Sequence, residues 1–127
     1  MPRIGQLARK DVVRARLSDP VGEIAEHARA DGWDTAMVVN DKGIVLGRLF
    51  KEQLEEDPAA SAGEVMQPGP STFRPDVDVV YMTKFMAENE LETAPVTTSD
   101  GVLIGVALKE DLDQVRDELP VDEAEDT

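Results

Sequence analysis

The stretch GVLIGVALKEDL, residues 101–112, decides the fold because the chain contains a near copy of it, GIVLGRLFKEQL, at residues 43–54. The two stretches share their apolar pattern, both glycines and the ending Lys-Glu-x-Leu. Among the positions at which they differ, Asp111 stands where the first copy has Gln53. The near copy indicates an internal repeat, and the Asp/Gln difference indicates that its two halves do not share one chemistry.

The repeat extends over most of the chain. A shift of 58 positions superposes residues 5–54 on residues 63–112 without a gap, with eleven identities in fifty positions. Self-similarity at a fixed period indicates one supersecondary unit used twice.

Each copy predicts the same order of elements, β-α-β-β-α. A short extended piece precedes a helix with apolar residues at helical spacing, and two strands joined by a turn lead into a second helix. The expected elements of the first copy are an extended piece at 12–17, a helix from Val21, strands at 35–40 and 44–50, and a helix from Lys51. In the second copy they are an extended piece at 71–74, a helix from Val79, strands at 93–98 and 102–108, and a helix from Lys109.

The boundaries of these elements carry their own signals. Asp19 and Asp78 precede the first helix of each copy and are expected to cap it, with Pro20 in the first helical turn. Gly43 and Gly101 are expected to supply the positive φ of the hairpin turns.

A unit of about fifty residues has too little core to stand alone, so the two copies are expected to pack together. The predicted fold class is α/β (α+β), with the repeats packed sheet to sheet about a pseudo-two-fold axis. The expected organisation is repeat 1 at 1–54, a connector at 55–62, repeat 2 at 63–114, and a helix end with an acidic tail at 115–127. Order is expected to about Leu119 and mobility beyond it.

Composition excludes several functional classes. The 127 residues include no cysteine and one histidine, His27, so a disulfide, a thiolate nucleophile and a His- or Cys-based metal site are not expected. No catalytic motif is found, and we expect no enzyme activity. The apolar runs are far shorter than the roughly 20 residues of a membrane span, and the N-terminus lacks a signal peptide, so we expect a cytoplasmic protein without membrane contact.

The formal net charge of -14 is concentrated in the second half. Residues 1–54 hold nine Lys/Arg and eight Asp/Glu, whereas residues 55–127 hold four and nineteen. Such acidity repels phosphates and argues against a nucleic-acid partner. It fits either a solvated surface or an acidic docking face for a basic partner.

Three motifs give the chain a family resemblance. They are GEVMQPGPSTFRPDVDV (residues 63–79), ETAPVTTSDGVLIG (92–105) and KEDL (109–112), with the same frame more weakly in residues 19–49. In this order and with this duplication, the chain resembles a tandem pair of cystathionine β-synthase (CBS) domains, a Bateman module, over about residues 4–114. We expect a stand-alone module.

The resemblance implies binding of an adenine nucleotide or related ligand between the repeats. The family signature is Gly-h-h-Thr/Ser-x-x-Asp, with h apolar, whose Asp accepts hydrogen bonds from ribose hydroxyls. Here the first copy has Phe50 and Gln53 at the hydroxyl and acid positions, while the second has Leu108 but keeps Asp111. The resemblance therefore implies at most one site, in the cleft served by repeat 2. Its candidate residues are Asp111, Leu108, Lys109, Thr93, Ala94, Pro95, Ser71 and Thr72, with Arg14, Arg16, Arg74, Phe50 and Gln53 as weaker candidates.

Two functional hypotheses remain open. In the first, a ligand-responsive regulatory module binds AMP, ADP, ATP or S-adenosylmethionine, requires no cofactor, and signals to a partner protein. In the second, the site has decayed and the chain is a dimerising scaffold, with Asp111 an ordinary surface acid favoured by the helix dipole. In both, the resemblance implies a homodimer through the helical faces, for which the apolar Val79, Met82, Phe85 and Met86 are the expected contacts.

Overall fold

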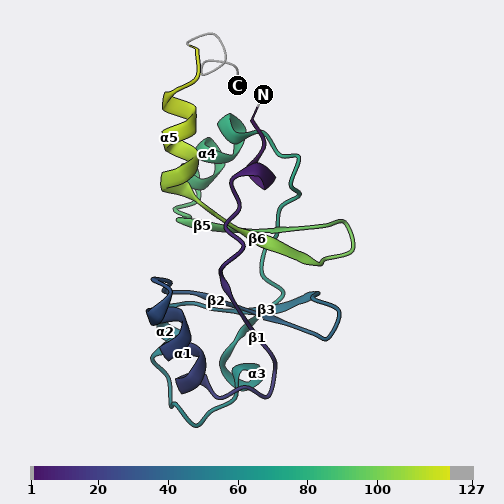
Figure 1. Ribbon diagram of the computed structural model, residues 1–127, viewed down its shortest axis with the longest axis vertical. Helices are drawn as coiled ribbons and strands as arrows, with labels where there is room; N and C mark the ends of the chain where they lie inside the picture. Colours follow the sequence, from purple (N-terminus) through teal and green to yellow (C-terminus); the bar gives the residue numbers. More distant parts are fainter. Residues whose placement is uncertain (1, 121–127) are drawn as a thin grey trace. The chain divides into compact units, whose positions relative to one another are not determined.

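The computed structural model describes residues 2–120, which divide into two compact units (Figure 1). The first-repeat unit contains residues 11–70 and 100–103. The second-repeat unit contains, among the described residues, 2–10, 71–99 and 104–120. Each unit combines helices with a small sheet, as the mixed α/β prediction requires.

The first-repeat unit is a four-stranded sheet with helices. Its strand order is β1-β2-β3-β4, with β1 parallel to β2 and the other pairs antiparallel. The elements are β1 (Val13–Ala15), α1 (Val21–Ala30), β2 (Ala36–Val39), β3 (Val45–Leu49), α2 (Lys51–Leu54), α3 (Ala62–Val65) and β4 (Gln67–Pro68).

The second-repeat unit follows the same plan with shorter sheet edges. Strands β5 and β6 pair with each other, and single bridges extend this pair on both sides. Phe73 bridges Val96 in parallel, and Arg9 bridges Val106 antiparallel, which are the positions of β1 and β4 shifted by 58. The elements are the 3-10 helix η1 (Ile4–Gln6), α4 (Val79–Glu88), β5 (Thr93–Thr97), β6 (Leu103–Leu108) and α5 (Lys109–Asp117).

The two repeats exchange their leading segments. Residues 2–10 lie in the unit built by the second repeat, and the equivalent residues 60–68 lie in the unit built by the first. The repeat boundaries in the sequence therefore differ from the boundaries of the two units. An alignment of the repeats shows which residues are equivalent, but it does not show which unit a segment packs in. Equivalent backbone bonds hold both segments: Ile4 donates to Val77 and Ala62 to Asp19, and Gly5 donates to Pro75 and Gly63 to Leu17, each at 2.9 Å.

Three of the four expected dimer contacts on α4 are not surface residues, whereas the fourth, Phe85, is half-buried. Val79, Met82 and Met86 are fully buried in the core of the second-repeat unit, together with Ile4 and Leu112. These three side chains pack against Ile4 of the segment 2–10 inside the unit, so they are not available as the expected dimer contacts.

Both first helices start where the sequence predicts, but only one of them has the expected cap. Asp78 caps α4, as expected, by accepting a hydrogen bond from the backbone N–H of Tyr81 at 3.2 Å. The expected cap by Asp19 is wrong: Pro20 is the N-cap of α1, and the Asp19 carboxylate accepts from the backbone N–H of Arg16 at 2.9 Å. The Asp19 carboxylate thus stabilises the turn before Pro20 instead of the start of α1.

The hairpin turns and the second helices begin as expected. Gly43 and Gly101 have φ values of 80° and 88°, which favour glycine. Helix α2 from Lys51 is a single turn of four residues, whereas α5 from Lys109 has nine. The tail expected to be mobile, beyond Leu119, lies almost wholly outside the described residues.

Candidate functional site

Asp111 lies in the first turn of α5 and is held by an arginine from the exchanged segment. The Nε of Arg9 donates to one carboxylate oxygen at 2.8 Å and its Nη2 to the other at 2.9 Å. The Asp111 side chain is 24% exposed and that of Arg9 is 47% exposed. This planar two-bond pairing fixes the orientation of the carboxylate at the surface of the unit.

The backbone also fixes the position of Arg9. Its N–H donates to the Val106 carbonyl at 2.8 Å, and the Val106 N–H donates back at 3.0 Å. A Cβ at Gly105 would lie 2.5 Å from the Arg9 carbonyl oxygen, so this close approach requires glycine. Arg9 is not among the site residues predicted from the sequence, because only the exchange of segments brings residues 9 and 111 into contact.

The first-repeat unit has a neutral pair at the equivalent positions. Shifted by 58, Arg9 corresponds to Gln67 and Asp111 to Gln53. The Gln53 side-chain oxygen turns back to its own helix and accepts from the Phe50 N–H at 2.8 Å. Arg9 and Asp111 have opposite charges in the sequence, but this indicates an ion pair only when it is known that residues 2–10 lie in the second-repeat unit.

The other main candidates lie on β5 and on the segment that leads into the second repeat. Ala94 is fully buried in the core cluster, Pro95 is buried, and its carbonyl accepts from the Phe73 N–H at 2.9 Å. Thr93 and Thr72 are half-buried, and Ser71 is exposed. Of this group, Thr93, Thr72 and Ser71 therefore offer side chains to solvent.

Leu108 and Lys109 form the start of α5. Leu108 is its N-cap and provides no side-chain hydrogen bond, while the Lys109 N–H donates to the Glu92 carbonyl at 2.9 Å. The Lys109 ammonium pairs with Asp113, four residues along the helix, at 2.7 Å. A nine-residue helix with acids at 110 and 111 in its first turn has a favourable dipole arrangement.

Two of the candidate arginines, Arg16 and Arg74, contact the hairpin turn of their own unit. Arg16 pairs with the Asp41 carboxylate, and Arg74 donates to the carbonyl of Thr98 at 2.9 Å. These are equivalent contacts, one in each unit. Arg14 donates to the Val12 carbonyl at 3.3 Å. The structure thus gives Arg16 and Arg74 a part in holding the hairpin turns.

Phe50 is covered by an arginine that sequence reasoning missed. The Arg48 guanidinium carbon lies 4.3 Å from the centre of the Phe50 ring, and its Nε donates to the Thr35 hydroxyl at 3.1 Å. Arg48 is only 5% exposed, and this burial lowers its pKa to about 10, partly opposed by the Asp34 carboxylate. The residue equivalent to Arg48 is Val106, an apolar residue of the predicted strand. A charged residue at an equivalent strand position could therefore have indicated that Arg48 is buried.

Within residues 2–120, no group of three or more His, Asp and Glu side chains is placed to hold a metal ion. In the same part of the chain, no helix has the length and apolar character of a membrane span.

Comparison with known proteins identifies the class. Residues 62–124 match the family model of the CBS domain. Uncharacterized protein MK0525 of Methanopyrus kandleri is 25% identical over 120 residues, which cover 88% of this chain and 61% of that protein. The magnesium transporter MgtE of Thermus thermophilus is 30% identical over 128 residues, which cover 96% of this chain and 28% of the transporter. The chain therefore spans less than two thirds of either curated relative.

Solved structures agree on the fold. The CBS domains of a transcriptional regulator from Streptococcus pneumoniae align with a TM-score of 0.82 at 19% identity, over 90% of this chain and 98% of that one. The cytosolic domain of the Mg²⁺ channel MgtE in complex with ATP aligns at 0.80 and 27% identity, over 90% and 48%. CBSX2 in complex with AMP aligns at 0.80 and 17% identity, over 91% and 96%.

The fold is thus that of a pair of CBS domains. Residues 62–124 belong to the CBS domain family, as the sequence motifs of the second repeat predicted.

Proposed function

We propose that this chain is a cytoplasmic regulatory module that binds an adenine nucleotide through its second-repeat unit and signals to a partner protein. Two similar CBS structures contain ATP or AMP, which supports this class of ligand. The proposed role is binding and signalling rather than catalysis, with AMP, ADP, ATP and S-adenosylmethionine as the ligands to test.

The observation that carries the proposal is the Asp111 carboxylate. It is partly exposed at the start of a nine-residue helix, and Arg9 holds it in one orientation. A carboxylate has about four lone-pair positions, and the two bonds from Arg9 leave acceptor capacity for two ribose hydroxyls. A guanidinium beside the sugar position also suits an anionic phosphate.

The first-repeat unit offers no such group. Gln53 is neutral and its side-chain oxygen caps its own helix, while Arg48 covers a face of Phe50. The proposal therefore places one ligand in the second-repeat unit and none in the first.

The alternative function, a scaffold without a ligand, also has a specific observation in its favour. Both oxygens of Asp111 already accept hydrogen bonds from Arg9, so the ion pair satisfies the carboxylate without any ligand. In that case the pair has a structural task, which is to fix residues 2–10 to α5.

Isothermal titration with AMP, ADP, ATP and S-adenosylmethionine tests the proposal through two matched variants. Asp111→Ala removes charge-assisted hydrogen bonds worth about 1.5–3 kcal/mol, so we expect affinity to fall about tenfold or more. Gln53→Ala is the equivalent change in the first-repeat unit and is expected to leave affinity within about twofold.

Circular dichroism melts of both variants would separate a lost contact from a lost fold. Equal loss of affinity in the two variants would contradict a single site. If the unmodified chain binds none of the four compounds, the scaffold function is favoured.

A further inference from the structure

The second-repeat unit holds the segment 2–10 by contacts near both of its ends. At the first end, Ile4 is fully buried in the core of the unit, and its backbone N–H donates to the Val77 carbonyl at 2.9 Å. At the second end, Arg9 exchanges two backbone hydrogen bonds with β6, and its guanidinium donates to Asp111. The candidate ligand site therefore lies at the Arg9 end of the segment.

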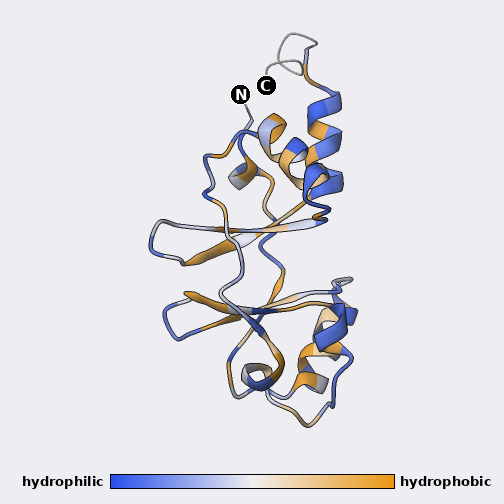
Figure 2. Cartoon of the chain, turned by 180° about the vertical axis from the view of Figure 1, so that it is seen from behind, coloured by the Kyte–Doolittle hydropathy of each residue, from blue (hydrophilic) through white to orange (hydrophobic). Residues whose placement is uncertain are grey.

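The link between the segment and the start of α5 is an exposed ion pair. Both oxygens of Asp111 accept from the Arg9 guanidinium, although the two side chains are 24% and 47% exposed. Figure 2 shows that α5 is largely hydrophilic, and of its nine residues one, Leu112, is buried. Water competes for a pair that is exposed to this degree, so the pair is weak and opens without disruption of the core. The Arg9 end therefore has a docked form and an open form.

The first-repeat unit retains the equivalent backbone contacts without this ion pair. Its equivalent positions hold Gln67 and Gln53, and the Gln53 side-chain oxygen accepts from the N–H of Phe50 in its own helix. The backbone N–H groups of Ala62 and Gly63 are nevertheless bonded as those of the second-repeat unit are, each at 2.9 Å. The first-repeat unit therefore shows how such a segment is held by its backbone when the charges are missing.

We propose that Arg9 is a positioning residue that couples nucleotide binding to the docking of residues 2–10. This inference rests on the proposed function. Arg9 uses two of the roughly four lone-pair positions of Asp111 and fixes the plane of the carboxylate, so the remaining positions keep one direction toward the ribose hydroxyls. When the Arg9 end opens, the carboxylate rotates and this orientation is lost.

The coupling acts in both directions. If docking of the segment raises the affinity for a nucleotide by some factor, then the bound nucleotide stabilises the docked segment by the same factor. The segment 2–10 is then the part of the second-repeat unit that responds to the ligand, although it lies outside the repeat that carries Asp111.

Titration with AMP and ATP tests the effect of the segment on the site. Arg9→Gln gives the second-repeat unit the residue that stands at the equivalent position 67, and affinity is expected to fall about fivefold, because binding must then order the carboxylate. Arg9→Lys retains the charge but not the planar pair of donors, so it is expected to lose about as much affinity. Gln67→Arg is the matched control and is expected to leave affinity within about twofold.

Amide hydrogen exchange, followed residue by residue, tests the effect of the site on the segment. Saturating AMP is expected to slow exchange about fivefold at three bonded amides of the segment, those of Ile4, Gly5 and Arg9. The equivalent amides of Ala62 and Gly63 are the internal control and are expected to change less than about twofold. In Arg9→Gln, the slowing is expected to fall below about twofold in the segment as well.

The outcomes separate this inference from the proposed function. Full affinity in Arg9→Lys would show that charge rather than orientation matters and would overturn the positioning role. Equal slowing of exchange in both segments would mean that the nucleotide stabilises the whole fold, and would overturn the coupling while leaving nucleotide binding intact. If the unmodified chain binds neither AMP nor ATP in the titration, the proposed function fails and the coupling fails with it.

Discussion

The two units of this protein share one plan but stabilise it with different chemistry. In the second-repeat unit, the exchanged segment is fixed by an ion pair between Arg9 and Asp111, and the neighbouring strand position is the buried apolar Val106. In the first-repeat unit, the ion-pair positions hold two glutamines, and the cation lies instead in the strand, at Arg48. Duplication preserved the backbone contacts, and the charged groups diverged around them.

This difference shows why an equivalent position does not mean an equivalent role. Gln53 and Asp111 both lie in the first turn of a helix, but one bonds within its own helix and the other bonds to the exchanged segment. The candidate ligand site therefore follows the charge pair, and only one unit has it.

The largest expected effect concerns the glycines beneath the exchanged segments. Gly105→Ala would place a Cβ 2.5 Å from the backbone oxygen of Arg9. Two hydrogen bonds with Val106 fix the backbone of Arg9, so we expect a loss of about 3 kcal/mol in the free energy of unfolding. The equivalent Gly47→Ala meets chiefly the flexible Met66 side chain and is expected to cost about 1 kcal/mol. Urea denaturation measures both, and equal losses would contradict the difference between the two edges.

A smaller effect of opposite sign is expected at Arg48. Its pKa is lower in the folded chain than in the unfolded one, so the fold disfavours the charged form, and Arg48→Met should raise stability at pH 7 by about 2 kcal/mol. The gain is complete below about pH 10 and shrinks as pH rises further, because the buried group then loses its proton. Thermal melts at pH 7 and at pH 10.5 test this, and a destabilised variant would show that Arg48 contributes more than it costs.

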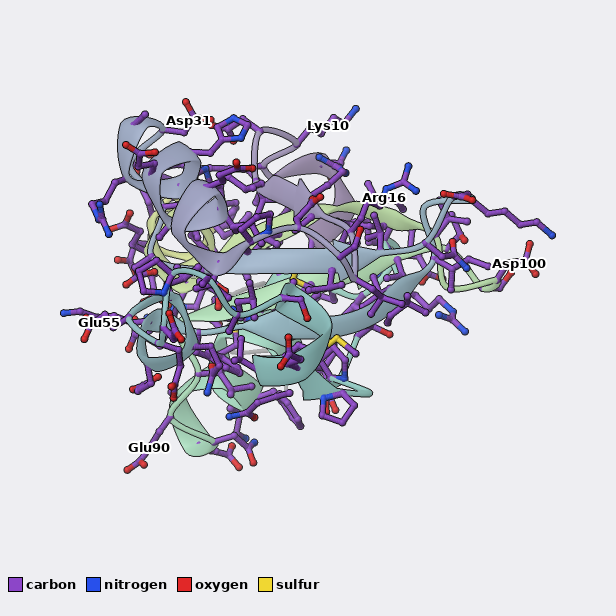
Figure 3. The ribbon with its side chains drawn as sticks, turned by 90° about the horizontal axis from the view of Figure 1, so that it is seen from below. Lys10, Arg16, Asp31, Glu55, Glu90 and Asp100 are labelled. Carbon is purple, nitrogen blue, oxygen red and sulfur yellow. The ribbon has the colours of Figure 1, made fainter. Side chains whose placement is uncertain are left out.

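The smallest effect concerns the ends of the first helices. Glu90 follows α4 with a φ of 56°, where the equivalent residue after α1 is Gly32 with a φ of 78°. Glu90→Gly is expected to stabilise the chain by about 0.5–1 kcal/mol, since glycine adopts this conformation without strain. Gly32→Glu is the matched control and should destabilise by a similar amount, because its Cβ position meets no other atom and only the backbone matters. An unchanged melting temperature in both variants would contradict the expected strain at Glu90. The Glu90 side chain extends into solvent in Figure 3, so the substitution removes no packing.

Local pattern was sufficient to predict the elements but not all of their caps. Apolar spacing located α1 and α4, and the glycines of the two hairpin turns predicted positive φ at Gly43 and Gly101. The cap by Asp78 followed from sequence, whereas Asp19 was wrong because a turn competed for the same carboxylate. Such competition depends on distances that a sequence does not contain.

The sequence by itself determined that one β-α-β-β-α unit occurs twice, that its family is that of the CBS domain, and that Asp111 lacks a counterpart in the first repeat. These features are properties of order and periodicity along the chain. Only the tertiary structure decided that the leading segments change places, that Arg9 holds Asp111, and that Arg48 is buried against Phe50. Each of these contacts joins residues through packing, and the choice between two equivalent partners depends on the free energy of the whole unit rather than on either residue alone.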